Sequence, residues 1–201
     1  MLAYVSLATG LLCATALLVG FAATAFRDDY RFWPPGADEE KRRVYLSCSR
    51  GFALCTLAVV ALDAGSATIP LWSRAVGGVV VIFAVGLLAK SGFDLGEEET
   101  TGRVGELRTD GLYRYTRNPQ NLGYILLFWS SAVASASLLV GILAGVLTIW
   151  MAAQSLIEEP WLRAQYDGYA EYARTVPRFI GIRTFHRVVD AIRSTRGDTD
   201  S

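Results

Sequence analysis

Long apolar segments alternate with short polar segments along this chain. Residues 2–26 form an uncharged apolar run, and two more runs, each with one arginine, follow at residues 44–62 and 69–89. A helix needs about 20 apolar residues to cross a bilayer, so each run predicts a transmembrane helix. No basic residue precedes the first run, which exceeds the apolar core of a signal peptide, about 7–15 residues. We therefore interpret the first run as a retained span.

The longest uncharged segment, residues 118–157, predicts two helices. As one helix it would extend roughly 60 Å at 1.5 Å per residue, about twice the hydrocarbon thickness of a bilayer. The stretch of small residues at 130–137 is the expected place of the chain reversal. We expect a hairpin of two spans, at residues 120–136 and 138–157, which brings the total to five.

Basic residues are distributed unevenly around these predicted spans. Of the 19 Lys and Arg residues, 17 lie in three segments: residues 27–43, residues 90–117 and the part after Glu159. The two remaining connections between spans carry neither Lys nor Arg. Because cytoplasmic loops are enriched in Lys and Arg, five spans with an outside N-terminus place all three basic segments in the cytoplasm. We expect an integral protein of a bacterial plasma membrane with a cytoplasmic C-terminus.

The C-terminal region predicts a peripheral helix and a tail. Between residues 182 and 193, apolar side chains recur at helical spacing with arginines interleaved, which is typical of an amphipathic helix at a membrane interface. Residues 194–201 are polar, and we expect them to be disordered. The fold class is therefore all-α, with residues 1–193 as a single membrane domain.

Composition agrees with a membrane protein and narrows the partners. The chain is 52% hydrophobic and 19% charged, below the roughly 25% charge of soluble domains. Its formal net charge of zero argues against nucleic acid as an electrostatic partner. Cys13, Cys48 and Cys55 form no CxxC pair, so we expect neither a disulfide framework nor a metal site.

The start of the fourth predicted span has the features of an anion-binding site. Asn118 is a suitable helix cap and Pro119 suits the first helical position. Free N–H groups of a first helical turn attract anions, and Arg114 and Arg117 come just before it. A carboxylate or phosphate would be stabilised there. The same residues also fit an ordinary helix start with cytoplasmic arginines, so the motif alone leaves both interpretations open.

The end of the fifth predicted span carries two acids in an unfavourable place. Glu158 and Glu159 are expected at a helix C-terminus, whose partial charge is already negative, and Pro160 is expected to stop the helix. A compensating cation is needed, either Arg163, Arg117 or a cationic ligand. The two hairpin ends together suit a zwitterionic cofactor with a sulfonium centre. A surface ion pair with Arg163 is the simpler alternative.

The two motifs together resemble the isoprenylcysteine carboxyl methyltransferase family and its relatives among the phospholipid N-methyltransferases. That family has a G-P-Y-x-x-x-R-H-P-x-Y-x-G signature, a hairpin, then E-E-x-x-L and a tyrosine-rich segment ending in Val-Pro. The matching residues lie between residues 110 and 182. They are Gly111, Tyr113, Arg117, Pro119, Gly123, Glu158, Glu159, Leu162, Tyr169, Tyr172, Val176 and Pro177.

The resemblance implies a membrane methyltransferase that uses S-adenosylmethionine. The cofactor would be held at the cytosolic face by residues 103–182, and a lipophilic acceptor (a carboxylate, amine or thiol) would enter from the bilayer. The residues that we expect to act in catalysis are Arg117, Glu158 and Glu159. Those that we expect to bind the cofactor are Tyr113, Arg117, Asn118, Pro119, Gln120, Asn121, Gly123, Glu159, Tyr169 and Tyr172.

Three positions depart from the family pattern. Leu112 replaces a proline, Asn118 replaces the histidine and Asn121 replaces the second tyrosine. Asparagine donates and accepts hydrogen bonds but cannot act as a base. An acceptor that must lose a proton would therefore need Glu158 or Glu159 for that purpose.

Two other functions fit parts of the pattern. A membrane reductase akin to the sterol reductases would bind NADPH at a similar C-terminal region. A non-enzymatic membrane scaffold would use the same residues only as helix caps and salt bridges. Binding of the two cofactors separates the first alternative from a methyltransferase, and loss of stability alone on neutralising Arg117 or Glu159 would indicate the second.

Overall fold

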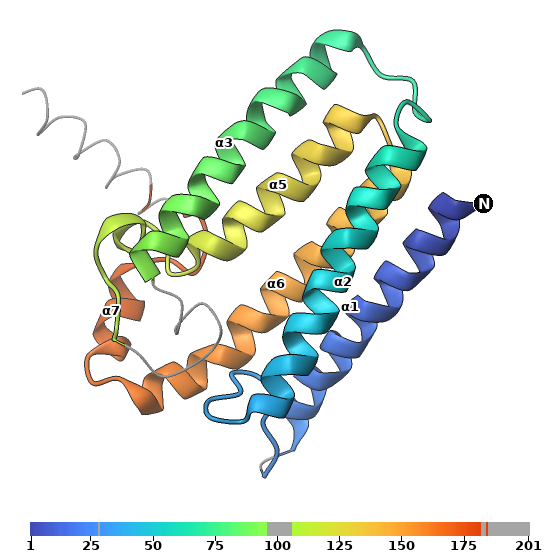
Figure 1. Cartoon of the computed structure of the whole chain (residues 1–201). Coiled ribbons are helices and arrows are strands. Elements are labelled where there is room, and N and C mark those ends of the chain that lie inside the picture. The colour runs from blue at the N-terminus through green and yellow to red at the C-terminus, as the bar shows by residue number, and fades with distance from the viewer. Residues whose placement is uncertain (28, 96–105, 182–183, 185–201) are drawn as a thin grey trace, which may run out of the picture.

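The computed structural model describes residues 1–27, 29–95, 106–181 and 184, and the elements among them are helices (Figure 1). The amphipathic helix predicted at residues 182–193 and the tail at 194–201 lie outside the described residues, except for Thr184. The elements in chain order are α1 (Leu2–Phe26), α2 (Glu39–Asp63), α3 (Leu71–Leu95), the 3-10 helix η1 (Gly111–Arg114), α5 (Pro119–Ser135), α6 (Leu138–Gln165) and α7 (Tyr169–Thr175).

Among the described residues, four helices are long and apolar enough to cross a membrane: α1, α2, α3 and α6. Such helices indicate a membrane protein. The expected fourth span at 120–136 corresponds to α5, which has 17 residues and extends about 26 Å at 1.5 Å per residue. It is thus shorter than the other four, although it lies between α3 and α6 and runs along both (Figure 1).

Aromatic side chains from three helices form the centre of the bundle. Phe52 of α2 stacks on Phe128 of α5, with ring centroids 5.5 Å apart. Trp150 of α6 contacts the edge of Phe52 at the same distance, 5.5 Å. All three rings are buried. In contrast, α3 packs mainly on α5 and leaves large apolar side chains such as Trp72 and Ile82 exposed, as expected for a face in contact with lipid.

The ends of two helices differ from the predicted spans. Helix α2 begins at Glu39 rather than at residue 44, because the Asp38 carboxylate accepts a hydrogen bond from the Lys41 N–H at 3.1 Å and caps a charged first turn. Helix α3 covers residues 71–95 instead of 69–89. In both cases polar residues extend an apolar span, since a helix that reaches the membrane surface can continue into water.

The predicted stop at Pro160 is wrong. Helix α6 continues through Pro160 to Gln165, so Glu158 and Glu159 lie inside the helix and not at its C-terminus. A proline removes one helical hydrogen bond, to the carbonyl four residues earlier. That carbonyl belongs to Leu156, which is exposed, as is Pro160. The loss therefore falls on the outer surface of the helix near its polar end, where it costs least.

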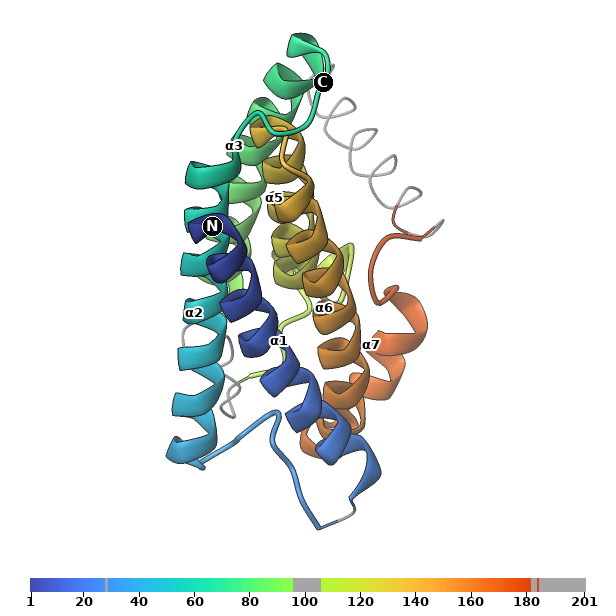
Figure 2. The same ribbon diagram turned by 90° about the vertical axis from the view of Figure 1, so that its right-hand side faces the viewer.

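The chain reverses where the small residues predicted it. Ala136 adopts a left-handed conformation with φ of 51°, and the Ser137 hydroxyl accepts a hydrogen bond from the Val140 N–H at 3.2 Å to cap α6. The connection between α2 and α3 lies against this turn, because the Gly65 N–H donates to the Ser135 carbonyl at 2.7 Å. The α1–α2 connection, the start of α5 and the end of α6 all lie at the opposite end of the bundle, near α7 (Figures 1 and 2).

Candidate active site

A pocket lies at the α7 end of the bundle, between the start of α5, the end of α6 and the segment around α7. Most of the residues that the sequence assigned to catalysis or cofactor binding line it. They are Tyr113, Arg117, Asn118, Gln120, Asn121, Glu158, Glu159, Tyr169 and Tyr172. The reversal of the chain at Ala136 thus brings the two sequence motifs to one place.

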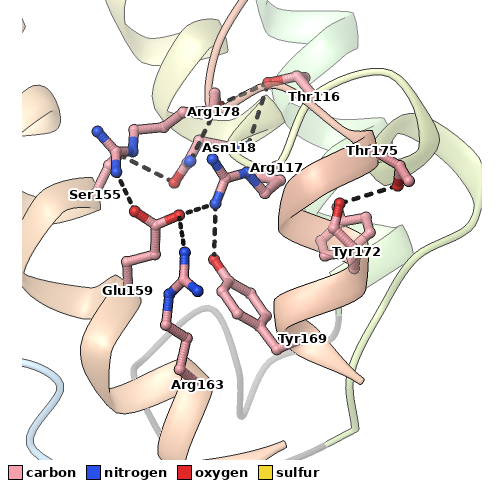
Figure 3. Close-up of polar contacts among 10 residues, drawn as sticks. All are labelled: Thr116, Arg117, Asn118, Ser155, Glu159, Arg163, Tyr169, Tyr172, Thr175 and Arg178. Atoms are coloured by element: carbon pink, nitrogen blue, oxygen red, sulfur yellow. Dashed lines mark hydrogen bonds and ion pairs between the residues drawn. The ribbon is translucent and has the colours of Figure 1, made fainter. Parts of the chain in front are cut away.

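Glu159 is the centre of an arginine cluster on one wall of this pocket (Figure 3). Its carboxylate forms ion pairs with Arg117 through Oε1 and with Arg178 through Oε2. Arg163 lies farther away, with 3.9 Å between its Nη2 and Glu159 Oε1. The Arg117 and Glu159 side chains are each 10% exposed. A buried carboxylate requires such partners, so the compensating cation expected from the sequence is mainly Arg117 together with Arg178.

Asn118 occupies the predicted position before α5 but does not cap it with its side chain. Its Oδ1 instead lies 3.0 Å from the Ser155 hydroxyl of α6. Its Nδ2 donates to the Arg178 carbonyl at 3.0 Å. The side chain therefore connects three segments.

Asn121 completes a polar contact between α5 and α6. Its Nδ2 donates to the Ser155 hydroxyl at 2.9 Å, and both residues are buried. Asn118 and Asn121 replace residues of the family pattern, and the structure gives both asparagines the same partner, Ser155. The Ser155 hydroxyl thus contacts two side-chain amides, and a histidine and a tyrosine at these two positions would not form the same hydrogen bonds.

The segment after α6 is bound firmly to the first motif. The Arg117 N–H donates to the Pro177 carbonyl at 3.0 Å, and the Tyr172 hydroxyl donates to the Tyr113 carbonyl at 2.7 Å. Tyr169 places its hydroxyl 3.5 Å from Arg117 Nη1. Burial raises the pKa of Tyr169 above its usual range, although the neighbouring Arg117 charge opposes this effect.

Three arginines at the pocket retain an unsatisfied donor. The Nε–H groups of Arg108, Arg117 and Arg178 are buried and have no hydrogen-bond partner among the described residues. A buried polar group without a partner costs about 1–3 kcal/mol. An anionic ligand in the pocket would supply the missing acceptors, so this wall suits a carboxylate or phosphate.

Glu158 lines the pocket beside Glu159 but has a different environment. It is half-buried and forms no ion pair in the part of the chain that the structure describes. Its neighbour Glu159 is neutralised by arginines. Of the two adjacent acids, Glu158 is therefore the one able to interact with a cation or to accept a proton.

Residues 72–168 match the model of the phospholipid methyltransferase family. This part of the chain is therefore similar to phospholipid methyltransferases. This agrees with the family of integral membrane methyltransferases that the two motifs resemble. No curated protein and no solved structure matches the chain.

The matched range contains most of the pocket but not all of it. The matched range includes Arg117, Glu158 and Glu159 and ends just before Tyr169. Arg178 comes after it, and Trp33 comes before it; both line the pocket. The connection between α1 and α2, α7 and the segment after α7 therefore add to this pocket from outside the matched range.

Two residues expected at the cofactor do not line the pocket. Pro119 is fully buried in the first turn of α5. Gly123 faces α3, where an added Cβ would lie 2.9 Å from Leu88 Cγ. That distance is shorter than a normal contact, so Gly123 permits close packing of α3 on α5.

Sequence reasoning missed several residues of the pocket. Arg108 and Arg178 lie inside the predicted cofactor segment. The need for a cation to compensate Glu158 and Glu159 was the signal that could have identified them. Ser155 and Gln154 lie one helical turn before the two glutamates, so helical spacing could have placed them on the same wall. Trp33 had no comparable signal, because only the folded chain brings the α1–α2 connection to α6.

Proposed function

We propose that this protein transfers a methyl group from S-adenosylmethionine to a lipophilic acceptor at the cytosolic face of the membrane. The observation that carries the proposal is the division of one pocket into two parts. One wall presents unsatisfied arginine N–H groups, and beside it stands Glu158, a carboxylate without an ion pair among the described residues.

The residues present fit this cofactor. The Nε–H groups of Arg108 and Arg178 are suited to its carboxylate, and the N-terminus of α5 adds to the same positive potential. Glu158 is suited to a cationic centre. Tyr169 and Tyr172 supply aromatic surface, and the two rings lie edge to face with centroids 5.9 Å apart. When bound, the cofactor supplies an electrophilic methyl group.

The protein's own contribution is positioning and proton transfer. The Arg117–Glu159 pair holds the ends of α5 and α6 together, and the contacts of Thr116 and Asn118 with the Arg178 carbonyl hold the C-terminal segment over the pocket. Fixed geometry of this kind accounts for a large part of many rate accelerations. For an amine or thiol acceptor, Glu158 takes the proton that the acceptor atom loses.

The acceptor reaches the pocket from the lipid side. The apolar faces of α3 and α6 expose large side chains such as Ile82 and Leu156, which suits a substrate dissolved in the bilayer. The distribution of basic residues supports a cytoplasmic pocket end and an outside N-terminus. A soluble cofactor can then enter from the aqueous side.

Equilibrium binding of radiolabelled S-adenosylmethionine to purified protein in lipid nanodiscs tests the proposal. The wild-type protein should bind saturably, and Arg108→Gln should weaken binding by roughly 5- to 20-fold, the loss of a hydrogen bond to a charged group. Arg50→Gln is the matched control, because Arg50 is exposed on α2 and does not line the pocket. Absence of saturable binding to the wild type would refute the proposal.

A further inference from the structure

A second set of unsatisfied polar groups lies in the pocket beside Glu158 and apart from the arginine wall. We propose that Trp33 and Gln154 form a subsite for a hydrogen-bond-accepting oxygen in the polar head of the lipid acceptor. The subsite rests on the proposed methyltransferase function and adds to it, because it specifies which head groups are accepted. Trp33 lies outside the matched range of the family.

Trp33 is held in place by contacts on several sides. The Phe32 N–H donates to the Thr24 hydroxyl at 2.9 Å, which ties the α1–α2 connection to the end of α1. The Trp33 ring stacks on Tyr45 of α2, with centroids 4.0 Å apart and 29° between the planes. Phe32 packs directly over Gly20, where an added Cβ would lie 2.5 Å from the ring. The indole therefore has little freedom to turn away.

The indole N–H of Trp33 has no hydrogen-bond partner among the described residues, although the side chain is only 2% exposed. A buried tryptophan N–H normally finds an acceptor. Trp33 lines the pocket together with Glu158 and interacts with its carboxylate, although no hydrogen bond forms between the two side chains. A ligand oxygen between them would satisfy this donor.

Gln154 supplies a second donor with a fixed orientation. Its Oε1 accepts hydrogen bonds from the Tyr45 hydroxyl and from the Trp150 indole N–H, both at 3.0 Å. Two donors on one atom assign that atom as the amide oxygen and not the nitrogen. The NH₂ group then has no hydrogen-bond partner within the described part of the chain. Because Gln154 lines the pocket, a ligand bound there can accept a hydrogen bond from this donor.

The two donors and Glu158 define the chemistry of the head group. Trp33 and Gln154 offer only N–H groups, which bind an oxygen of a phosphate, an ester or a carboxylate. Glu158 offers a carboxylate, which binds a protonated amine. A head group with an oxygen a few bonds from a protonatable nitrogen matches both, and an amine lacking that oxygen would leave both N–H groups without this acceptor. The subsite therefore selects the head group through its oxygen.

Binding of three matched lipids to full-length protein in nanodiscs, without cofactor, tests the subsite. The probes are hexadecyl phosphate, hexadecylamine and hexadecylphosphoethanolamine, each tritiated and corrected for uptake by empty nanodiscs. Trp33→Phe keeps the ring and removes the N–H. It should weaken binding of the two phosphate-bearing probes by roughly 5- to 20-fold and leave hexadecylamine unchanged. Trp72→Phe, at an exposed position of α3, should change none of the three.

Two results would overturn the subsite. Equal weakening of all three probes by Trp33→Phe would mean that Trp33 only positions Glu158 or supports the pocket, and no change in any probe would mean that its N–H binds no lipid oxygen. Gln154→Glu gives a second measurement if Trp33→Phe does not fold. It keeps an acceptor for Tyr45 and Trp150 and removes the NH₂ donor, so it should weaken binding of the same two phosphate-bearing probes but not of hexadecylamine. Equal weakening of all three probes, or weakening of none, would also contradict the proposal.

Failure of the subsite is distinguishable from failure of the proposed function. Probe binding is measured without cofactor. If the wild-type protein binds the lipids in the expected pattern but never binds S-adenosylmethionine, the result supports the subsite and refutes the methyltransferase function. If the protein binds the cofactor but its lipid binding does not depend on Trp33 or Gln154, the result supports the methyltransferase function and refutes the subsite.

Discussion

The Arg117 guanidinium and the Glu159 carboxylate form a buried ion pair that joins the start of α5 to the last turns of α6 (Figure 3). The pair closes the end of the hairpin opposite the turn at Ala136. Arg178 binds the other carboxylate oxygen, so Glu159 also fixes the C-terminal segment. One glutamate thus organises the three segments that surround the pocket.

Replacing this glutamate should cost stability. Glu159→Gln leaves Arg117 and Arg178 without a counter-charge in a buried place, and breaking one side of a buried pair costs about 3–5 kcal/mol. Chemical unfolding in detergent, followed by the near-ultraviolet signal, measures the free energy of unfolding. Glu40→Gln is the control at an exposed position and should change it by less than about 0.5 kcal/mol. Equal values for both variants would mean that the pair is not structural.

The contact between Asn121 and Ser155 should show coupling. Asn121→Leu and Ser155→Ala each remove one partner of a buried hydrogen bond and should each destabilise the protein by about 1–3 kcal/mol. Because the two side chains contact each other, the double variant should lose less than the sum of the single losses. Strictly additive losses would show that the 2.9 Å contact contributes nothing.

Gly123 should matter for packing and not for cofactor affinity. Gly123→Ala places a methyl group against Leu88 of α3 and should cost about 1–3 kcal/mol of stability. The folded fraction should bind S-adenosylmethionine as the wild type does. Gly141→Ala, where no atom lies within 4 Å of the added carbon, should be neutral or stabilising by up to about 1 kcal/mol. A loss of cofactor affinity in Gly123→Ala without a loss of stability would show that Gly123 belongs to the cofactor-binding site.

Alkaline pH should weaken the site through Tyr169. Burial raises the pKa of Tyr169 in the folded protein above the value of about 10 for an exposed tyrosine. The folded state therefore favours the protonated phenol. Its contribution is fully present below about pH 10 and is lost as the pH rises through the higher folded value. The free energy of unfolding of Tyr169→Phe should therefore fall less steeply with rising pH than that of the wild type. Tyr4→Phe, at an exposed position, should show the wild-type pH dependence.

Labelling of single cysteines tests the orientation. In a variant without Cys13, Cys48 and Cys55, a cysteine at Ser66 should react with an impermeant maleimide added to intact cells. A cysteine at Asp110, at the opposite end of the bundle, should react only after the cells are permeabilised. The reverse pattern would place the pocket outside and contradict the positive-inside assignment.

The sequence predicted the architecture better than the details of the site. Apolar run length located the long helices, and the small residues near Ala136 located the hairpin turn, because both are local signals. The predicted helix end at Pro160 was wrong, since a proline near an exposed helix end removes one hydrogen bond without ending the helix. Asn118 was placed correctly, but its side-chain partners, Ser155 and the Arg178 carbonyl, come from distant segments. Trp33 illustrates the same limit, because contacts of that kind follow from tertiary packing alone.

Methyl transfer from labelled S-adenosylmethionine to a total lipid extract, catalysed by the purified protein in nanodiscs, tests the central claim most directly. The wild type should produce an organic-soluble labelled product, Arg50→Gln should match it, and Glu158→Gln should reduce the rate by 10²–10⁴-fold if the acceptor must lose a proton. Wild-type protein that binds no cofactor and labels no lipid, under conditions where its fold is intact, would contradict the account.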